Sequence, residues 1–204
     1  MKQKIVMVFT VCMLIFLVAG CSKVDKEESK NDVLIEEEEI IDIQPKKKEL
    51  IASASTEYNS SKERQKNIEI AANELNGTKI KPLEVFSFNL ILGERTKEKG
   101  YMPAPSFLKK DGAVKVVKTL GGGICQVSST LYMTIKDTGV EVIERHPHSK
   151  RVSYCNEEEE AMVNYGTSDL QFKNTLNTDL EIEFVIEEKE SGKKKLICNL
   201  YHYV

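Results

Sequence analysis

The stretch Gly121-Gly122-Gly123-Ile124-Cys125-Gln126 runs straight into a helical pattern. Residues 114–120, just before this stretch, are rich in valine and predict a strand that feeds the glycines. Apolar residues then recur at helical spacing and predict a helix from Cys125 or Gln126 to about residue 138. The apolar stripe consists of Val127, Leu131 and Ile135. The sequence therefore predicts a cysteine in the first turn of a helix, reached through a glycine turn.

A second helix is predicted upstream, over residues 62–75. Ser60 or Ser61 is a suitable N-terminal cap, and Gly77 is a stop signal. One face of this helix is apolar and carries Ile68, Ala71, Ala72 and Leu75. We expect that face to pack on the core.

Most of the remaining chain reads as strands. Alternating apolar and polar residues predict strands at 140–143, 169–172, 180–186 and 195–201. The last two are expected to pair as a hairpin across Ser191-Gly192. Helices followed by strands predict an α+β fold, a single domain with two main helices packed on a largely antiparallel sheet.

The N-terminus has the pattern of an export signal. Lys2 and Lys4 precede an apolar run at residues 5–18, which is shorter than the roughly 20 residues that span a bilayer. The order of basic, apolar and small residues is that of a secretory signal. Cys21, directly after Ala19-Gly20, resembles the lipidated cysteine of the bacterial lipobox. We expect a signal peptide at 1–20, lipidation of Cys21, and a protein anchored to the outer face of the cytoplasmic membrane.

Charged residues dominate the segment that follows. It contains Glu36-Glu37-Glu38-Glu39 and Lys46-Lys47-Lys48, and such runs bury too little apolar surface to order themselves. We interpret 21–50 as the lipidated cysteine with a flexible tether and 51–204 as the folded domain. The formal net charge of −3, without a basic patch, argues against nucleic acid as a partner.

Three cysteines remain beyond the signal and the lipidation site: Cys125, Cys155 and Cys198. An odd number leaves at least one thiol outside any bridge within the chain. A Cys155–Cys198 disulfide is one possibility, and it would leave Cys125 as the free thiol that a nucleophile requires.

Several blocks between residues 56 and 186 resemble the VanW family of bacterial envelope proteins. They include Phe86-Ser87-Phe88-Asn89, Gly93-Glu94-Arg95-Thr96, Pro103-Ala104-Pro105, residues 121–132 and Glu144-Arg145-His146-Pro147-His148-Ser149. The family takes its name from vancomycin-resistance gene clusters and has no established reaction. The resemblance therefore implies an envelope role, which can be accessory to glycopeptide resistance.

The chain departs from the family pattern at two places. Pro82-Leu83 stands where relatives tend to have Pro-Gly. Cys155-Asn156 and four glutamates stand where relatives have a Pro-Gly turn and an Asp-Ala-Thr sequence. An acid acting from that second loop would have to be Glu160.

A thiol enzyme is the first of three hypotheses for the cysteine and histidines. A helix N-terminus favours the thiolate of Cys125, His148 can act as its base, and Asp169 can orient the histidine. Gln126 or backbone N–H groups of the glycine turn would stabilise the oxyanion. The order of helix-borne cysteine, histidine and acid is similar to the layout of papain-like and transglutaminase-like folds. Peptide or amide bonds of the cell wall are the substrates expected for such an exported enzyme.

A non-catalytic module that binds a cell-wall ligand is the second hypothesis. The glycine turn and the helix N-terminus would hold an anionic group, and arginines would add charge-assisted hydrogen bonds. The residues assigned to binding are Gly122, Gly123, Gln126, Arg95, Asn89, Arg145 and His146.

A metal site is the third hypothesis. It would use Cys125, His146, His148 and Cys155, but their spacing matches no usual zinc pattern. We therefore expect neither a metal nor another cofactor.

Overall fold

The two predicted helices form the centre of the molecule. The computed structural model describes residues 46–110 and 112–204. Helix α1 (Lys62–Leu75) is capped by Ser61, whose Oγ accepts a hydrogen bond from the backbone N–H of Arg64, and its predicted apolar face is buried. Helix α3 (Ile124–Ile135) buries its predicted stripe completely. Both helix predictions are confirmed.

A four-stranded antiparallel sheet lies against these helices. Its order is β1 (Lys48–Tyr58), β9 (Lys194–Tyr203), β8 (Leu180–Glu188) and β2 (Thr78–Ile80). The predicted hairpin is present as β8 and β9. Strand β1 begins at Lys48, inside the segment interpreted as a tether, and pairs with β9 along its length.

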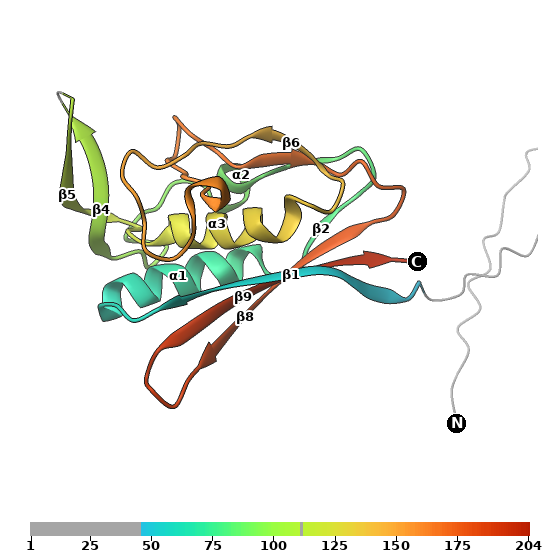
Figure 1. The fold of residues 1–204 in the computed structure, drawn as a ribbon, viewed down its shortest axis with the longest axis horizontal. Coiled ribbons are helices and arrows are strands. Elements are labelled where there is room, and N and C mark those ends of the chain that lie inside the picture. The colour runs from blue at the N-terminus through green and yellow to red at the C-terminus, as the bar shows by residue number, and fades with distance from the viewer. Residues whose placement is uncertain (1–45, 111) are drawn as a thin grey trace, which may run out of the picture. The chain divides into compact units, whose positions relative to one another are not determined.

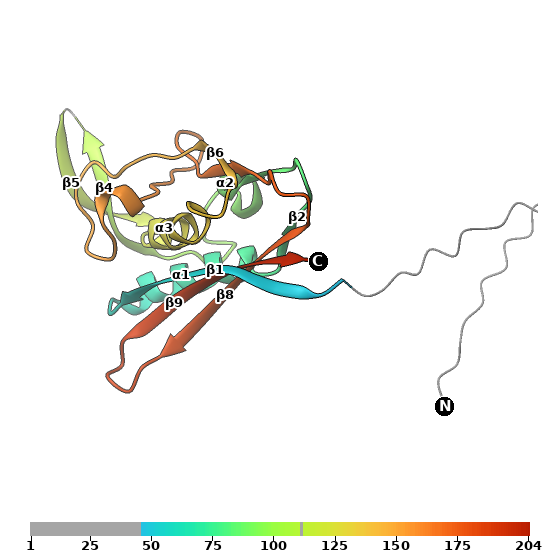
Figure 2. The ribbon, with the colours of Figure 1, turned by 45° about the vertical axis from the view of Figure 1, so that its right-hand side comes forward.

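A smaller antiparallel sheet covers the other side of the helices. It has the order β3 (Val85–Ser87), β7 (Gln171–Lys173) and β6 (Glu141–Glu144), and the short helix α2 (Phe88–Leu92) follows β3 directly. Phe86 and Phe172 stack at 4.7 Å between ring centroids. In Figures 1 and 2, α1 and α3 lie between this layer and the four-stranded sheet.

A two-stranded hairpin projects beside the layered body. It is formed by β4 (Pro103–Lys110) and β5 (Ala113–Leu120), and β5 leads directly into the glycine turn (Figure 1). The long loop from β6 to β7 carries a single 3₁₀ turn, η1 (Glu157–Glu159). The architecture is α+β with antiparallel sheets, as predicted.

The export signal, Cys21 and nearly all of the predicted tether lie outside the described residues. Within residues 46–110 and 112–204, no helix has both the length and the apolar character that crossing a membrane requires.

Candidate functional site

The glycine turn is filled by the chain's own groups. A Cβ added at Gly122 would lie 2.3 Å from the carbonyl oxygen of Ala104 in β4. The side chain of Arg95 packs on Gly121 and that of Arg64 packs on Gly123. These glycines are therefore needed for close packing of β4 and the two arginines against the start of α3.

Cys125 lies in the first turn of α3, as predicted, and is half-buried. Its Sγ donates a hydrogen bond to the carbonyl oxygen of Val163 at 3.5 Å. Burial raises the pKa of the thiol, while the positive charges of Arg95 and Arg64 oppose that rise. Desolvation thus outweighs the Val163 hydrogen bond and the two arginine charges, and the thiol needs a base to lose its proton.

Gln126 does not serve as the predicted oxyanion donor in this conformation. The residue is 1% exposed, and its Oε1 accepts a hydrogen bond from Arg64 at 3.0 Å. Its Nε2 donates to Thr56 Oγ1 at 3.0 Å and to the carbonyl oxygen of Glu57 at 3.2 Å. Because all its hydrogen bonds are made inside the protein, Gln126 joins α3 to α1 and β1.

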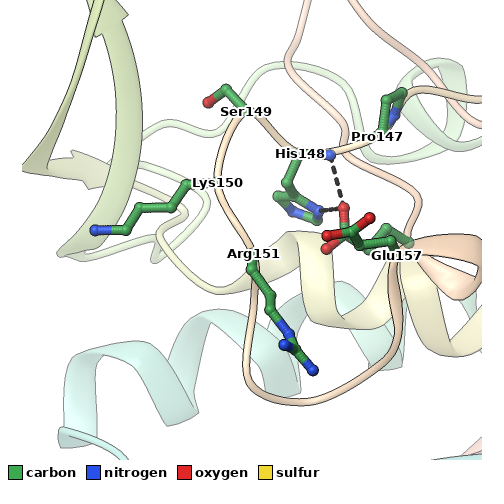
Figure 3. Close-up of a pocket in the computed structure, with 7 residues that line it drawn as sticks. Pro147, His148, Ser149, Lys150, Arg151 and Glu157 are labelled. Carbon is green, nitrogen blue, oxygen red and sulfur yellow. Dashed lines mark hydrogen bonds and ion pairs between the residues drawn. The ribbon is translucent and has the colours of Figure 1, made fainter.

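His148 lies in a pocket of about 240 Å³ in the β6–β7 loop. The pocket is lined by Pro147, His148, Ser149, Lys150, Arg151, Glu157 and Glu160. In Figure 3 the imidazole lies at the centre of these residues, while Lys150 points away from it. The ammonium group of Lys150 instead lies 5.8 Å from the ring centroid of Phe107 in β4.

Glu160 is the carboxylate that faces His148. Its side chain is 2% exposed and that of His148 is 6% exposed. One oxygen, Oε2, accepts the backbone N–H of His148 at 2.8 Å and lies 3.2 Å from Nδ1 of the ring. Desolvation lowers the pKa of His148, and the charge of Glu160 opposes that shift. The pair is a neutral imidazole held against a buried carboxylate, an arrangement suited to a general base.

Asp169 does not take the predicted role of orienting His148. Its carboxylate accepts hydrogen bonds from Ser87 Oγ at 2.5 Å, from the Asn89 N–H at 2.9 Å and from the Leu170 N–H at 2.8 Å. These bonds fix the junction of β3 and α2. Glu160 occupies the place beside the imidazole that the sequence assigned to Asp169.

Arg95 and Asn89 form a buried pair next to α2. The Nη2 group of Arg95 donates to Asn89 Oδ1 at 2.7 Å, and Nη1 donates to the carbonyl oxygen of Gly93 at 2.8 Å. Arg95 is 7% exposed, and its Nε meets no acceptor in the described chain. Desolvation lowers the pKa of the guanidinium, while the charges of Tyr101 and Cys125 oppose that shift.

His146 and Arg145 hold the loop segments in place. The Nε2 of His146 lies 2.8 Å from Glu144 Oε1, which also accepts the backbone N–H of Asp169. The Arg145 side chain donates to the carbonyl oxygens of Glu160 at 2.6 Å and Glu157 at 2.8 Å. Arg145 therefore positions the pocket wall through its own hydrogen bonds.

Tyr154 is the residue that sequence reasoning missed. Its hydroxyl lies 3.4 Å from Nε2 of His148, and the two rings meet edge to face with centroids 6.3 Å apart. A tyrosine between a basic stretch and a run of glutamates carries no pattern that distinguishes it. Only the folded loop brings it to the histidine.

The three remaining cysteines are free thiols, so the Cys155–Cys198 bridge is wrong. Cys198 is fully buried in β9, whereas Cys155 is half-buried in the β6–β7 loop. Within residues 46–110 and 112–204, no group of three His, Cys, Asp or Glu side chains gathers as a metal site.

The chain is similar to a known protein family and to individual proteins of two bacteria. A family model described as VanW like protein matches residues 63–197. The uncharacterized protein YoaR of Bacillus subtilis is 36% identical over 158 residues, which is 73% of this chain and 50% of that protein. The vancomycin B-type resistance protein VanW of Enterococcus faecalis is 29% identical over 133 residues, 61% of this chain and 46% of that protein.

The chain thus spans about half the length of the curated relatives it matches. No solved structure matches it.

Proposed function

The chain belongs to the VanW family, and from that premise we propose that it is a cysteine-dependent hydrolase or transferase of the cell envelope. Cys125 is the nucleophile, His148 is the general base, and Glu160 orients the histidine. The observation that carries this proposal is the buried Glu160–His148 pair, whose atoms Oε2 and Nδ1 lie 3.2 Å apart at an open pocket.

The protonation states of the two groups fit this chemistry. Burial raises the pKa of Cys125, so the resting side chain is a neutral thiol at neutral pH. Desolvation lowers the pKa of His148, so its imidazole is neutral and free to accept a proton. A neutral thiol with a neutral imidazole is the starting state of base-assisted nucleophilic attack.

The substrates are peptide or amide bonds of the cell wall. The thiolate attacks the carbonyl carbon, and the imidazolium of His148 returns its proton to the leaving amine as the C–N bond breaks. Water or a second amine then attacks the thioester carbonyl, releases Cys125 and completes hydrolysis or transfer. The sequence of residues 1–21 supports an exported protein, anchored through a lipid on Cys21 to the outer face of the cytoplasmic membrane.

The similarity to the resistance protein of Enterococcus faecalis is compatible with a role that is accessory to glycopeptide resistance. Cleavage or exchange of wall peptides would act on the polymer in which glycopeptides bind. This role depends on the activity proposed for Cys125.

The experiment is a measurement of the alkylation rate of Cys125 by iodoacetamide against pH. The full chain is used in detergent, and mass spectrometry resolves the labelling of each cysteine. We expect His148→Ala to lower the rate at pH 7 at least about tenfold, the factor that corresponds to one pKa unit. His202→Ala, a histidine at the end of β9, is the matched control.

Equal rates in the wild type and in His148→Ala would overturn the enzyme proposal. If the rates differ, muropeptides are the substrates to test next, with Cys125→Ser as the inactive variant. A thioester on Cys125, seen as a mass increase at that residue, would identify the acyl group transferred.

A non-catalytic wall-binding module is the second candidate, and Arg95 favours it. The Nε of its buried guanidinium meets no acceptor among the described residues, and a bound anion would supply one. In that case Cys125→Ser keeps the affinity for muropeptides, whereas Arg95→Gln weakens it. Calorimetric titration with both variants separates the two candidates.

A further inference from the structure

The hairpin of β4 and β5 stands apart from the two layers of sheet. The two strands form a sheet of their own, in which each strand pairs only with the other. Figures 1 and 2 show the hairpin projecting beside the layered body, at the end opposite to the start of β1. Its outer edges border no other strand of the described chain, so its surface is available to another molecule.

One face of this hairpin exposes large apolar side chains. Phe107 and Val116 lie directly opposite each other in the register, and they are 39% and 64% exposed. Residues that are opposite in an antiparallel pair point to the same face of the sheet. Contact with an apolar phase would recover the free energy that the exposure of this pair to water costs.

Basic side chains lie beside this apolar pair. Lys118 is two residues from Val116 in β5 and so lies on the same face. Lys150 points out of the pocket loop in Figure 3, and its ammonium group lies 5.8 Å from the ring centroid of Phe107. Both lysines are exposed, and neither forms an ion pair with a carboxylate in the described part of the chain. Although the formal net charge of the whole chain is −3, residues 103–120 contain one acid, Asp111, and four lysines: Lys109, Lys110, Lys115 and Lys118.

We propose that this face of the hairpin docks on a bilayer surface that contains anionic phospholipids. Phe107 and Val116 enter the boundary between headgroups and acyl chains, and the lysines pair with the phosphates of the headgroups. A soluble anionic polymer would contact the lysines but would leave the apolar pair in water. Lysines along an edge strand oppose pairing with a second copy of the chain. The bilayer is therefore the partner that fits both the charge and the apolar pair.

Docking gives the protein a second point of contact with the membrane, besides the lipid proposed on Cys21. Because Lys150 reaches Phe107 from the loop that carries His148, a docked hairpin holds the pocket near the headgroups. This inference rests on the location proposed above, the outer face of the cytoplasmic membrane, and is independent of the activity proposed for Cys125.

Phe107→Trp tests the docking, because the chain contains no tryptophan and the variant keeps an aromatic ring at this position. The full chain is reconstituted into phosphatidylcholine vesicles with and without phosphatidylglycerol. We expect the tryptophan emission to shift to shorter wavelength, and to be quenched by brominated acyl chains, only in the vesicles that contain phosphatidylglycerol. Val185→Trp, at a position 38% exposed in β8, is the matched control and should show neither change.

The contribution of the lysines is measured in the same reporter chain. We expect Lys118→Ala to lower the ratio of docked to free hairpin about fivefold, the factor for one basic residue near an anionic surface. Lys193→Ala removes an equal charge from an exposed position between β8 and β9 and should leave the ratio unchanged. Circular dichroism of each variant checks that the fold is retained.

The outcomes separate the docking from the proposed function. No shift in either kind of vesicle overturns the docking and leaves the proposed activity, which the alkylation of Cys125 tests, as it stands. An equal shift in both kinds overturns the role of the lysines. A shift with a soluble glycerol phosphate polymer, and none with vesicles, overturns the bilayer as the partner in favour of a wall polymer. The proposed location is tested separately, by the distribution of the chain between the membrane and soluble fractions of the cells that produce it.

Discussion

The glycine turn and the histidine loop differ in what fills them. At residues 121–123 the space left by the absent side chains is taken by Ala104, Arg64 and Arg95. At residues 147–160 the loop leaves an open pocket of about 240 Å³ in front of a buried carboxylate–imidazole pair. The turn therefore places the start of α3, whereas the loop supplies the accessible chemistry.

This difference shows that a distinctive sequence can have a packing cause. Three consecutive glycines suggest a surface left open for a ligand, yet Gly122 lies directly under a backbone carbonyl of β4. The loop has a less distinctive sequence, but it holds Glu160 and Tyr154 against His148. A functional hypothesis for this chain thus has to include the histidine loop as well as the glycine turn.

Gly122→Ala gives the largest change expected for the fold. The new Cβ would lie 2.3 Å from the oxygen and 2.6 Å from the carbon of the Ala104 carbonyl. Backbone cannot yield as a flexible side chain does, so we expect the free energy of unfolding to fall by about 3 kcal/mol, the upper end for overpacking. Urea unfolding followed by circular dichroism measures it.

Gly166→Ala is the control for this change. Gly166 has a φ of 80° and nothing within 4 Å of an added Cβ, so only the backbone conformation is penalised, by about 1 kcal/mol. An equal, small loss in both variants would mean that the turn is not closely packed. The glycine turn and the histidine loop would then no longer differ in how closely they are packed.

The helices and the long hairpin were predictable because their signals are local. Helical spacing, a serine cap and stop glycines defined α1 and α3, and alternation around Ser191-Gly192 defined β8 and β9. Strand β1 was missed because its sequence lacks clear alternation and starts in a lysine run. Its place depends on pairing with β9, which is distant in the chain.

The site was only partly predictable, for a similar reason. Cys125 and His148 stand out by residue type and sequence context. The partner of His148 was assigned to Asp169 from chain order, but local hydrogen bonds hold Asp169 at the β3–α2 junction. Tyr154 depends on how an irregular loop folds back, and no periodicity encodes that path.

Leu83→Gly separates two reasons why a position can favour glycine, namely its backbone conformation and a close contact with another part of the chain. Leu83 has a φ of 66°, which lies in the left-handed region that penalises a Cβ. The side chain is 69% exposed, so its removal costs little packing. We expect the free energy of unfolding to rise by about 1 kcal/mol, in contrast to the loss at Gly122, where contact is the constraint.

Leu90→Gly is the matched control. Leu90 is 82% exposed within α2, in ordinary helical backbone, so glycine there should destabilise by about 1 kcal/mol. Thermal and urea unfolding of both variants provide the comparison. Destabilisation by Leu83→Gly would contradict a conformational explanation and would point to contacts made by the leucine.

Glu160→Gln should affect the chemistry of the loop more than its stability. Glutamine keeps an oxygen to accept the His148 N–H, and Oε1 of Glu160 meets no donor within the described chain. We expect the free energy of unfolding to change by less than about 1 kcal/mol. Loss of the carboxylate charge lowers the pKa of His148 further and weakens it as a base, so Cys125 is alkylated more slowly.

Glu157→Gln is the control for that variant, since Glu157 lines the same pocket from an exposed position. A Cys125 rate equally reduced in both variants would show that general loop charge, rather than the buried carboxylate, controls the thiol. The buried carboxylate of Glu160 would then have no specific role in the chemistry of the loop.

The smallest expected effect is a pH dependence of stability that belongs to His148. Desolvation lowers the folded-state pKa of this histidine below the value of about 6.5 in the unfolded chain. As the pH falls through that range, the unfolded chain binds a proton that the folded protein does not, so stability is full above about pH 6.5 and declines below it. Carboxylates such as Glu181 have lowered pKa values and contribute only at more acid pH.

Unfolding measured between about pH 7 and pH 5 isolates the histidine from the carboxylates. We expect His148→Gln to flatten the decline, while His202→Gln retains it because His148 is still present. A decline of the same size in His148→Gln would mean that the loop relaxes and hydrates its imidazole at no cost. The Glu160–His148 pair would then lack the rigidity that distinguishes this pocket from an ordinary surface loop. The only remaining difference between the loop and the glycine turn would be the close packing at the glycines.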